Sequence, residues 1–165
     1  KTLEIVKILE DLGVSAITIH ARTKEQKYTG KADWNEIRKA KEKSNVPIIG
    51  NGDIFKPGTA KAMLEQTKCD GVMIGRGAIG NPFIFRNTKT LLETGNNGPE
   101  PSEKEKIDCF MRFLGYYKRY EKLRSFTELR QQAMWFTKDL SGARILRNRL
   151  MRAKSVEEIL AIYNR

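Results

Sequence analysis

The sequence predicts an α/β region with parallel strands, followed by an all-helical region. Short apolar runs begin near residues 16, 46 and 71 and alternate with amphipathic stretches of helical spacing, a pattern typical of parallel βαβ units. A segment dense in Gly, Asn and Pro follows, and beyond it the pattern is helical only. We therefore predict one domain at 1–94, a linker at 95–102 and a second domain at 103–165.

In the first domain, helices and strands are expected to alternate. The opening helix, at 1–12, is followed by Gly13 as a stop signal, and its apolar residues Ile5, Ile8, Leu9 and Leu12 share one face. Further helices are expected at 33–44 and 59–68, with Pro57 suited to the first turn of the second of these, and a turn followed by a helix is expected at 79–93. Because helical crossovers normally cover a parallel sheet, we expect both of its faces to be buried.

The number of predicted strands is too small for a complete fold. Three parallel strands neither close a barrel nor form a well-covered open sheet, and a complete (β/α)₈ barrel needs at least about 200 residues. The chain also opens inside a helix, on Lys1. We therefore expect it to be the C-terminal piece of a longer protein, which by itself has a half-open core and an unpaired sheet edge that copies of the piece could cover.

The second domain is predicted to be a helical bundle. Helices are expected at 103–124, 126–140, 142–154 and 156–165. Ser125 with Glu128, and Ser155 with Glu158, have capping-box spacing, while Ser141 and Gly142 interrupt the pattern.

The charge is strongly positive and unevenly distributed. The net charge is +11, and the last 65 residues carry 15 Lys+Arg against 8 Asp+Glu. Such asymmetry favours a polyanionic partner, most often nucleic acid, although a merely soluble surface remains the alternative.

One helix concentrates this charge. Over 142–154, helical spacing puts Leu146, Leu150 and Ala153 on one face and spreads arginines over the rest: Arg144, Arg147, Arg149 and Arg152. Guanidinium groups bind phosphates bidentately, so we predict an RNA-binding face, against the alternative of a solvated one. Further residues could extend it: Arg130, Lys138, Tyr116 and Tyr117.

Several classes of protein and site are not supported. No apolar run approaches the ~18 residues of a membrane span, and no signal peptide is visible, so we expect a cytoplasmic protein without membrane contact. Cys69 and Cys109 are far apart and lack metal-ligand spacing, which supports neither a disulfide framework nor a metal site.

Two glycine turns occupy equivalent places after successive strands. They are NGD at 51–53 and GRG at 75–77. Ligands of parallel α/β folds bind at the carboxyl ends of the strands, where glycine lets backbone N–H groups approach a phosphate and Arg76 adds charge. His20 ends the neighbouring strand, so we predict that this single histidine also faces a ligand.

Three segments carry a resemblance to a known family. They are HARTKEQKYTGKADW (20–34), VPIIGNGDI (46–54) and DGVMIGRGAIGNPFIF (70–85), and SGARILRNRLMRAKSVEE (141–158) adds to them. They closely resemble the tRNA-dihydrouridine synthases, particularly the bacterial, nitrogen-regulation-like branch. The resemblance implies an FMN-binding TIM barrel, of which this chain holds the C-terminal portion of about three βα units, followed by a helical tRNA-binding domain.

The resemblance also implies roles for individual residues. The expected flavin-binding set is His20 at the ring, then the phosphate residues Asn51, Gly52, Asp53, Gly75 and Arg76. Arg22 is expected on the substrate side of the site, and Lys24, Lys27 and Tyr28 on the side from which RNA arrives.

The implied reaction is reduction of uridine to 5,6-dihydrouridine in tRNA, with NADPH reducing FMN and a cysteine supplying a proton. The family's cysteine segment and flavin-contacting lysine do not occur here, and neither Cys69 nor Cys109 matches. We therefore expect no catalytic residue in this chain and no activity of the chain alone. The alternatives are a non-catalytic RNA-binding fragment and another phosphate-binding flavin barrel acting on a small metabolite. The target uridine is not determined.

Overall fold

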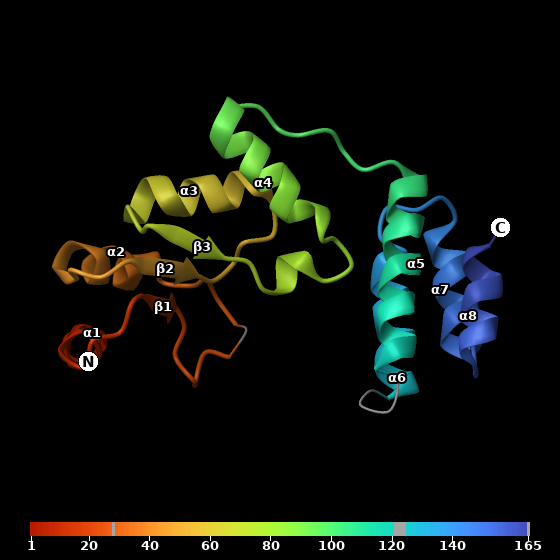
Figure 1. The fold of residues 1–165 in the computed structure, drawn as a ribbon, viewed down its shortest axis with the longest axis horizontal. Helices are drawn as coiled ribbons and strands as arrows, with labels where there is room; N and C mark the ends of the chain where they lie inside the picture. The colour runs from red at the N-terminus through yellow and green to blue at the C-terminus, as the bar shows by residue number, and fades with distance from the viewer. Residues whose placement is uncertain (28, 121–124, 165) are drawn as a thin grey trace. The chain divides into compact units, whose positions relative to one another are not determined.

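The computed structural model describes residues 1–27, 29–120 and 125–164, and the chain divides into two units (Figure 1). The sheet unit comprises Lys1–Ala78 and Ile84–Gly98. The helical unit comprises Ile79–Phe83 and the chain from Pro99 onward. The change from one unit to the other after residue 98 falls inside the segment predicted as a linker.

Helices and strands alternate along the sheet unit, as predicted. In order they are α1 (Thr2–Asp11), β1 (Ile17–His20), α2 (Trp34–Lys43), β2 (Ile48–Asn51), α3 (Pro57–Thr67), β3 (Gly71–Met73), the 3₁₀ helix η1 (Arg76–Ala78) and α4 (Phe83–Thr94). Pro57 is the first residue of α3, and Gly13, with φ +77°, follows the end of α1. Both signals act as the sequence indicates.

The strands form one parallel sheet in the order β1-β2-β3. The register pairs His20 with Asn51, and Asn51 with Met73. The last residues of the three strands therefore lie in one row across the carboxyl edge of the sheet.

Only one face of this sheet is fully covered by the described residues. Ile17, Ile19 and Ile48 are buried against residues of α2 and α3, whereas Thr18 and His20 are exposed. The general expectation for βαβ units, that both faces are buried, is therefore not met in the chain as described, and the half-open core expected of a piece by itself is present. The reason is that α2 and α3 supply the apolar residues of one core, and no described element supplies the same for the second face.

Helix α1 buries only part of the apolar stripe seen in the sequence. Val6, outside the stripe, is buried at 3% exposure, and Leu9 of the stripe packs against the same core. The other three residues of the stripe, Ile5, Ile8 and Leu12, are 56%, 58% and 75% exposed. These three side chains do not contribute to the core of the sheet unit.

The helical unit contains α5 (Glu103–Arg119), α6 (Phe126–Phe136), α7 (Ala143–Arg152) and α8 (Val156–Tyr163). Its core includes side chains with no exposed surface: Phe110, Leu129, Leu150 and Ile159. The helix predicted at 103–124 is described as far as Arg119, and residues 121–124 and 165 lie outside the described residues.

Serine caps begin three of these helices. The predicted Ser125–Glu128 capping box is present, and a second box, Ser102–Glu105, begins α5. Ser155 accepts a hydrogen bond from the Glu158 N–H at 3.2 Å, but the Glu158 carboxylate accepts from Lys154 N–H rather than closing the box. The caps fix where each helix starts.

The turn and helix predicted at 79–93 are present: Ile79–Phe83 belongs to the helical unit, and α4 begins at Phe83. Gly80 has φ +65°, and a Cβ there would lie 2.5 Å from the carbonyl oxygen of Trp135. Glycine is required here by both backbone conformation and close packing against α6.

Candidate functional site

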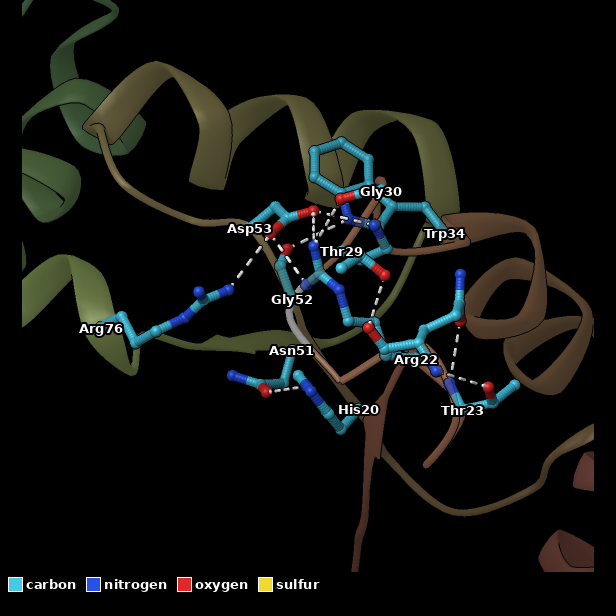
Figure 2. Close-up of polar contacts among 12 residues, drawn as sticks. His20, Arg22, Thr23, Thr29, Gly30, Trp34, Asn51, Gly52, Asp53 and Arg76 are labelled. Carbon is cyan, nitrogen blue, oxygen red and sulfur yellow. Dashed lines mark hydrogen bonds and ion pairs between the residues drawn. The ribbon is translucent and has the colours of Figure 1, made fainter.

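The predicted flavin-binding residues gather at the carboxyl edge of the sheet (Figure 2). A cleft of about 200 Å³ opens there. Its lining includes all six of them: His20, Asn51, Gly52, Asp53, Gly75 and Arg76. Strands β1 and β2 and the turns after β2 and β3 supply these residues, because parallel strands bring their carboxyl ends to one edge.

Side chains from two strands and a backbone carbonyl from the third are linked by hydrogen bonds along this edge. His20 Nδ1 lies 2.5 Å from Asn51 Oδ1, as Figure 2 shows. The Asn51 amide Nδ2 donates to the Met73 carbonyl oxygen at 2.7 Å. The row set by the strand register thus becomes a polar chain, and the Asn51 side chain is committed within it.

Gly52 shapes the turn after β2. Its φ is +134°, and a Cβ would lie 2.7 Å from the Cβ of Ala32. Its carbonyl accepts a hydrogen bond from the Trp34 indole N–H at 3.1 Å. The loop before α2 therefore packs directly on this turn, and no larger residue would fit.

Asp53 is the centre of the charged contacts in the cleft. It has φ +59°, and its carboxylate accepts hydrogen bonds from Arg22 Nη2 at 2.9 Å and from the Ala32 N–H at 2.8 Å. Arg76 Nη2 lies 3.5 Å from the same carboxylate. The sequence did not indicate that Asp53 joins two arginines.

These contacts change the acidity of Asp53. Burial would raise the pKa of this carboxyl, but the hydrogen bonds from Arg22 and Ala32 and the charges of Arg22 and Arg76 outweigh it. The pKa is held below its ordinary value. The carboxylate is therefore ionised at neutral pH, and the two guanidinium groups beside it leave the cluster with one positive charge in excess.

Arg22 is largely enclosed. Its side chain is 3% exposed, Nη1 forms an ion pair with Asp53 Oδ1 at 2.8 Å, and Nη2 also donates to the Gly30 carbonyl at 2.9 Å. Nε is buried and has no hydrogen-bond partner among the described residues. This geometry ties the loop after β1 to the turn after β2, while contact of Arg22 with a substrate stays a prediction. Of the loop residues expected to face RNA, Lys24 is exposed, Lys27 has φ +48°, and Tyr28 lies outside the described residues.

The turn after β3 suits an anionic group. A Cβ on Gly75 would meet no atom within 4 Å, so glycine is not required there by packing. It leaves the backbone open beside the cleft, where the Arg76 guanidinium, 40% exposed, lies over the Phe55 ring at 5.2 Å. An open backbone next to an arginine fits an anionic group such as a phosphate, and the net positive cluster with Asp53 fits it as well.

Neither cysteine is among the residues that line this cleft. Cys69 is buried at the amino end of β3, where its Sγ contacts the Gly71 carbonyl oxygen at 3.2 Å. Cys109 is a half-buried free thiol on α5. In the described ranges, no group of three or more His, Cys, Asp or Glu residues is placed to hold a metal ion. Nor is any helix there both long and apolar enough to cross a membrane.

The arginine-rich helix has the predicted faces. Leu146, Leu150 and Ala153 are buried. All four arginines of the prediction, Arg144, Arg147, Arg149 and Arg152, are exposed, and so are Ile145, Asn148 and Met151. Arg130 differs from them, because it is half-buried and its Nη1 lies 3.4 and 3.5 Å from the Met151 and Ala153 carbonyl oxygens at the end of α7.

A second cleft, within the helical unit, brings together residues that the sequence only partly indicated. It has a volume of about 640 Å³. Its aromatic lining is Phe113, Tyr116, Tyr117, Tyr120 and Trp135. Tyr116 and Tyr117 were predicted to extend the RNA-binding face, and the helical spacing of Phe113 and Tyr120 from them could have added those two.

Comparison with known proteins agrees with the resemblance. The family model described as dihydrouridine synthase matches residues 1–164. The probable tRNA-dihydrouridine synthase 1 of Synechocystis sp. is 37% identical over 156 residues, covering 94% of this chain and 44% of that protein. The probable tRNA-dihydrouridine synthase of Aquifex aeolicus is 35% identical over 161 residues, covering 95% and 49%.

A third relative is more similar over a shorter stretch. The tRNA-dihydrouridine synthase B of Pasteurella multocida is 42% identical over 112 residues, which cover 68% of this chain and 34% of that protein. The chain thus spans half or less of the length of each of these relatives. Because the family match extends over nearly the whole sequence, this chain belongs to the dihydrouridine synthase family.

Proposed function

We propose that the protein containing this chain reduces uridine to 5,6-dihydrouridine in tRNA, and that this chain contributes the FMN-phosphate site and an RNA-binding surface. The observation that carries the proposal is the gathering of His20, Asn51, Gly52, Asp53, Gly75 and Arg76 around one cleft in a member of this family. The relatives bear the name of this activity.

Different residues of the cleft would bind different parts of FMN. The open backbone at Gly75 and the guanidinium of Arg76 would hold the phosphate, and His20 would contact the flavin ring. Asp53 would orient Arg76 rather than touch the phosphate, because like charges repel. FMN, reduced by NADPH, supplies the hydride for the uracil ring. Neither Cys69 nor Cys109 lies in this cleft, so we assign the proton donor to neither.

The second part of the proposal concerns RNA. A uracil inside folded tRNA must be exposed before it reacts, which costs a few kcal/mol and calls for a large docking surface. The four exposed arginines of α7 fit a phosphate backbone. We place the reaction in the cytoplasm and expect no membrane partner. In this proposal the helical unit is a tRNA-binding bundle, and the sheet unit is part of a TIM barrel.

The test uses the full-length protein, purified and titrated with FMN, then incubated with NADPH and unmodified tRNA. Dihydrouridine should appear in the tRNA by mass spectrometry only when all three are present. Flavin binding without dihydrouridine, together with turnover of a free pyrimidine, would instead favour a metabolite enzyme.

A non-catalytic RNA-binding role is the second candidate, and the exposed arginines of α7 favour it for the 165-residue chain by itself. This role would be supported if the chain binds tRNA with an affinity that falls steeply with salt and does not retain FMN. The same measurement on the full-length protein would then show whether flavin binding needs the remainder of the protein.

A further inference from the structure

We infer that Asn51 is a positioning residue that fixes His20 in the Nδ1–H tautomer, so that Nε2 accepts a hydrogen bond from a ring imide N–H of the ligand. The tautomer follows from contacts on the strand edge alone. The identity of the ligand rests on the proposed function.

The first step concerns the orientation of the Asn51 amide. The Met73 backbone carbonyl can only accept a hydrogen bond, and it lies 2.7 Å from the Asn51 amide nitrogen Nδ2. The opposite orientation would place two acceptor oxygens at this short distance. Asn51 must therefore direct Nδ2 toward Met73 and its oxygen, Oδ1, toward His20.

The second step concerns the imidazole of His20. Oδ1 of Asn51 can only accept, and it lies 2.5 Å from Nδ1 of His20. The proton between them must therefore be on Nδ1. A neutral imidazole carries one N–H, so its other nitrogen, Nε2, is left as an acceptor.

The third step is what this leaves for a ligand. His20 lines the cleft, and no described residue hydrogen-bonds its Nε2. An unprotonated nitrogen accepts from an N–H donor and cannot donate to a carbonyl oxygen. The isoalloxazine ring of FMN and the uracil base share one such donor, the imide N–H between two carbonyls. The other polar atoms of the pyrimidine ring of oxidised FMN are acceptors, which an unprotonated Nε2 would not bind.

The strand register makes this arrangement rigid. His20, Asn51 and Met73 are paired partners across β1, β2 and β3, so each link is set by backbone hydrogen bonds rather than by a loop. Asn51 orients the imidazole with a neutral amide. A carboxylate in its place would add a negative charge, which favours a protonated imidazole.

The first experiment measures the tautomer directly by ¹⁵N NMR on full-length protein labelled at histidine, at a pH where the imidazole is neutral. His20 is identified by its loss in His20→Gln. We expect Nε2, which couples to both ring carbon protons, to resonate as the unprotonated nitrogen. In Asn51→Ala this single tautomer should give way to a mixture, whereas Asn35→Ala, which removes an exposed asparagine outside the cleft, should leave it unchanged. A protonated Nε2 in the neutral wild-type ring would overturn the inference.

The second experiment identifies the imide. Binding of FMN is compared with that of 3-methyl-FMN, and reaction of uridine in tRNA with that of 3-methyluridine at the same position. Loss of one hydrogen bond should weaken the methylated partner about tenfold, and Asn51→Ala should narrow that difference. Discrimination against only one analogue assigns the bond to flavin or to uracil. If 3-methyl-FMN binds as tightly as FMN and 3-methyluridine reacts as well as uridine, the imide contact is refuted. Failure to bind FMN at all would refute the proposed function and leave the NMR result standing.

Discussion

A carboxylate beside a phosphate site is at first sight unfavourable, yet Asp53 is held between two arginines in this cleft. It compensates the buried charge of Arg22 and keeps Arg76 at the cleft, while the cluster as a whole stays positive. Asp53 has φ +59°, and in this conformation its carboxylate accepts a hydrogen bond from the Ala32 N–H in the loop before α2.

Asp53→Asn should destabilise the sheet unit by about 2 kcal/mol, since it leaves the enclosed guanidinium of Arg22 without a charged partner. Thermal unfolding monitored by circular dichroism would measure the loss. Asp70→Asn is the matched control, because Asp70 also bonds a cation, Lys41, and a backbone N–H, but its side chain is 40% exposed. An equal loss in both variants would contradict a special role for the Arg22–Asp53 pair.

The same pair predicts a dependence on pH. The pKa of Asp53 is lowered in the folded state, so its stabilisation is complete above the pKa of an unfolded aspartate and is lost as the pH falls through the lowered folded value. The difference in melting temperature between wild type and Asp53→Asn should therefore be constant near neutrality and shrink in acid. A difference that persists at a pH well below the folded pKa would argue against this carboxylate as its source.

Arg76→Ala should weaken FMN binding by the full-length protein ten- to a hundredfold, which corresponds to about 1.5–3 kcal/mol for a hydrogen bond to a charged group. Quenching of flavin fluorescence would measure the affinity. Arg38→Ala removes an exposed arginine of α2 outside the cleft and should have no effect. Unchanged affinity in Arg76→Ala would remove Arg76 from the phosphate site.

Helix α7 illustrates how similar arginines acquire different roles. Arg144, Arg147, Arg149 and Arg152 lie on its exposed surface, opposite the buried Leu146 and Leu150. Arg130 comes from α6 and directs its guanidinium to the carbonyl groups at the end of α7. A cation at this position satisfies carbonyls without helical partners and complements the helix dipole.

This contrast gives a paired test with tRNA. Arg147→Ala combined with Arg149→Ala should weaken binding and lower the slope of log affinity against log salt by about 1 for each lost phosphate contact. Arg130→Ala should instead lower the melting temperature, with little change of that slope. Filter binding over a range of salt, together with thermal unfolding, would separate the two effects. A reduced slope in Arg130→Ala with unchanged stability would reverse the assignment.

The sheet unit leaves large apolar side chains unburied by the described residues: Met73 on the open face of the sheet, at 51% exposure, and Ile5, Ile8 and Leu12 on α1. Exposed apolar side chains in such numbers favour association. Strand β1 lies at one edge of the sheet and has unpaired backbone groups there.

We therefore expect the 165-residue chain by itself to self-associate through edge strand β1 and the exposed apolar residues of α1. Sedimentation velocity over a range of concentrations should show dimers or larger species, and Ile8→Lys should raise the dissociation constant about tenfold. Ile145→Lys, on α7, is the matched control, since Ile145 is 67% exposed and Ile8 58%. A chain that stays monomeric at high concentration would exclude this association.

The sequence by itself determined the local structure and the residues of the cleft. Alternating apolar runs gave the parallel βαβ order, Pro57, Gly13 and the Ser125–Glu128 box gave helix ends, and the turns at 51–53 and 75–77 gave the cleft residues. These features could be predicted because periodicity, capping and turn geometry depend on neighbours along the chain. The arginine face of α7 was predictable for the same reason.

Tertiary structure decided which partners those residues have. Four contacts join residues more than twenty positions apart. They are the pairs of Asp53 with Arg22 and with Arg76, the contact of Arg130 with the end of α7, and the polar chain from His20 to Met73. Tertiary packing also decides which residues of α1 enter the core: Val6 is buried, whereas Ile5, Ile8 and Leu12 stay exposed. Sequence spacing carries no signal for such contacts, because they arise only when parallel strands align and helices pack on them.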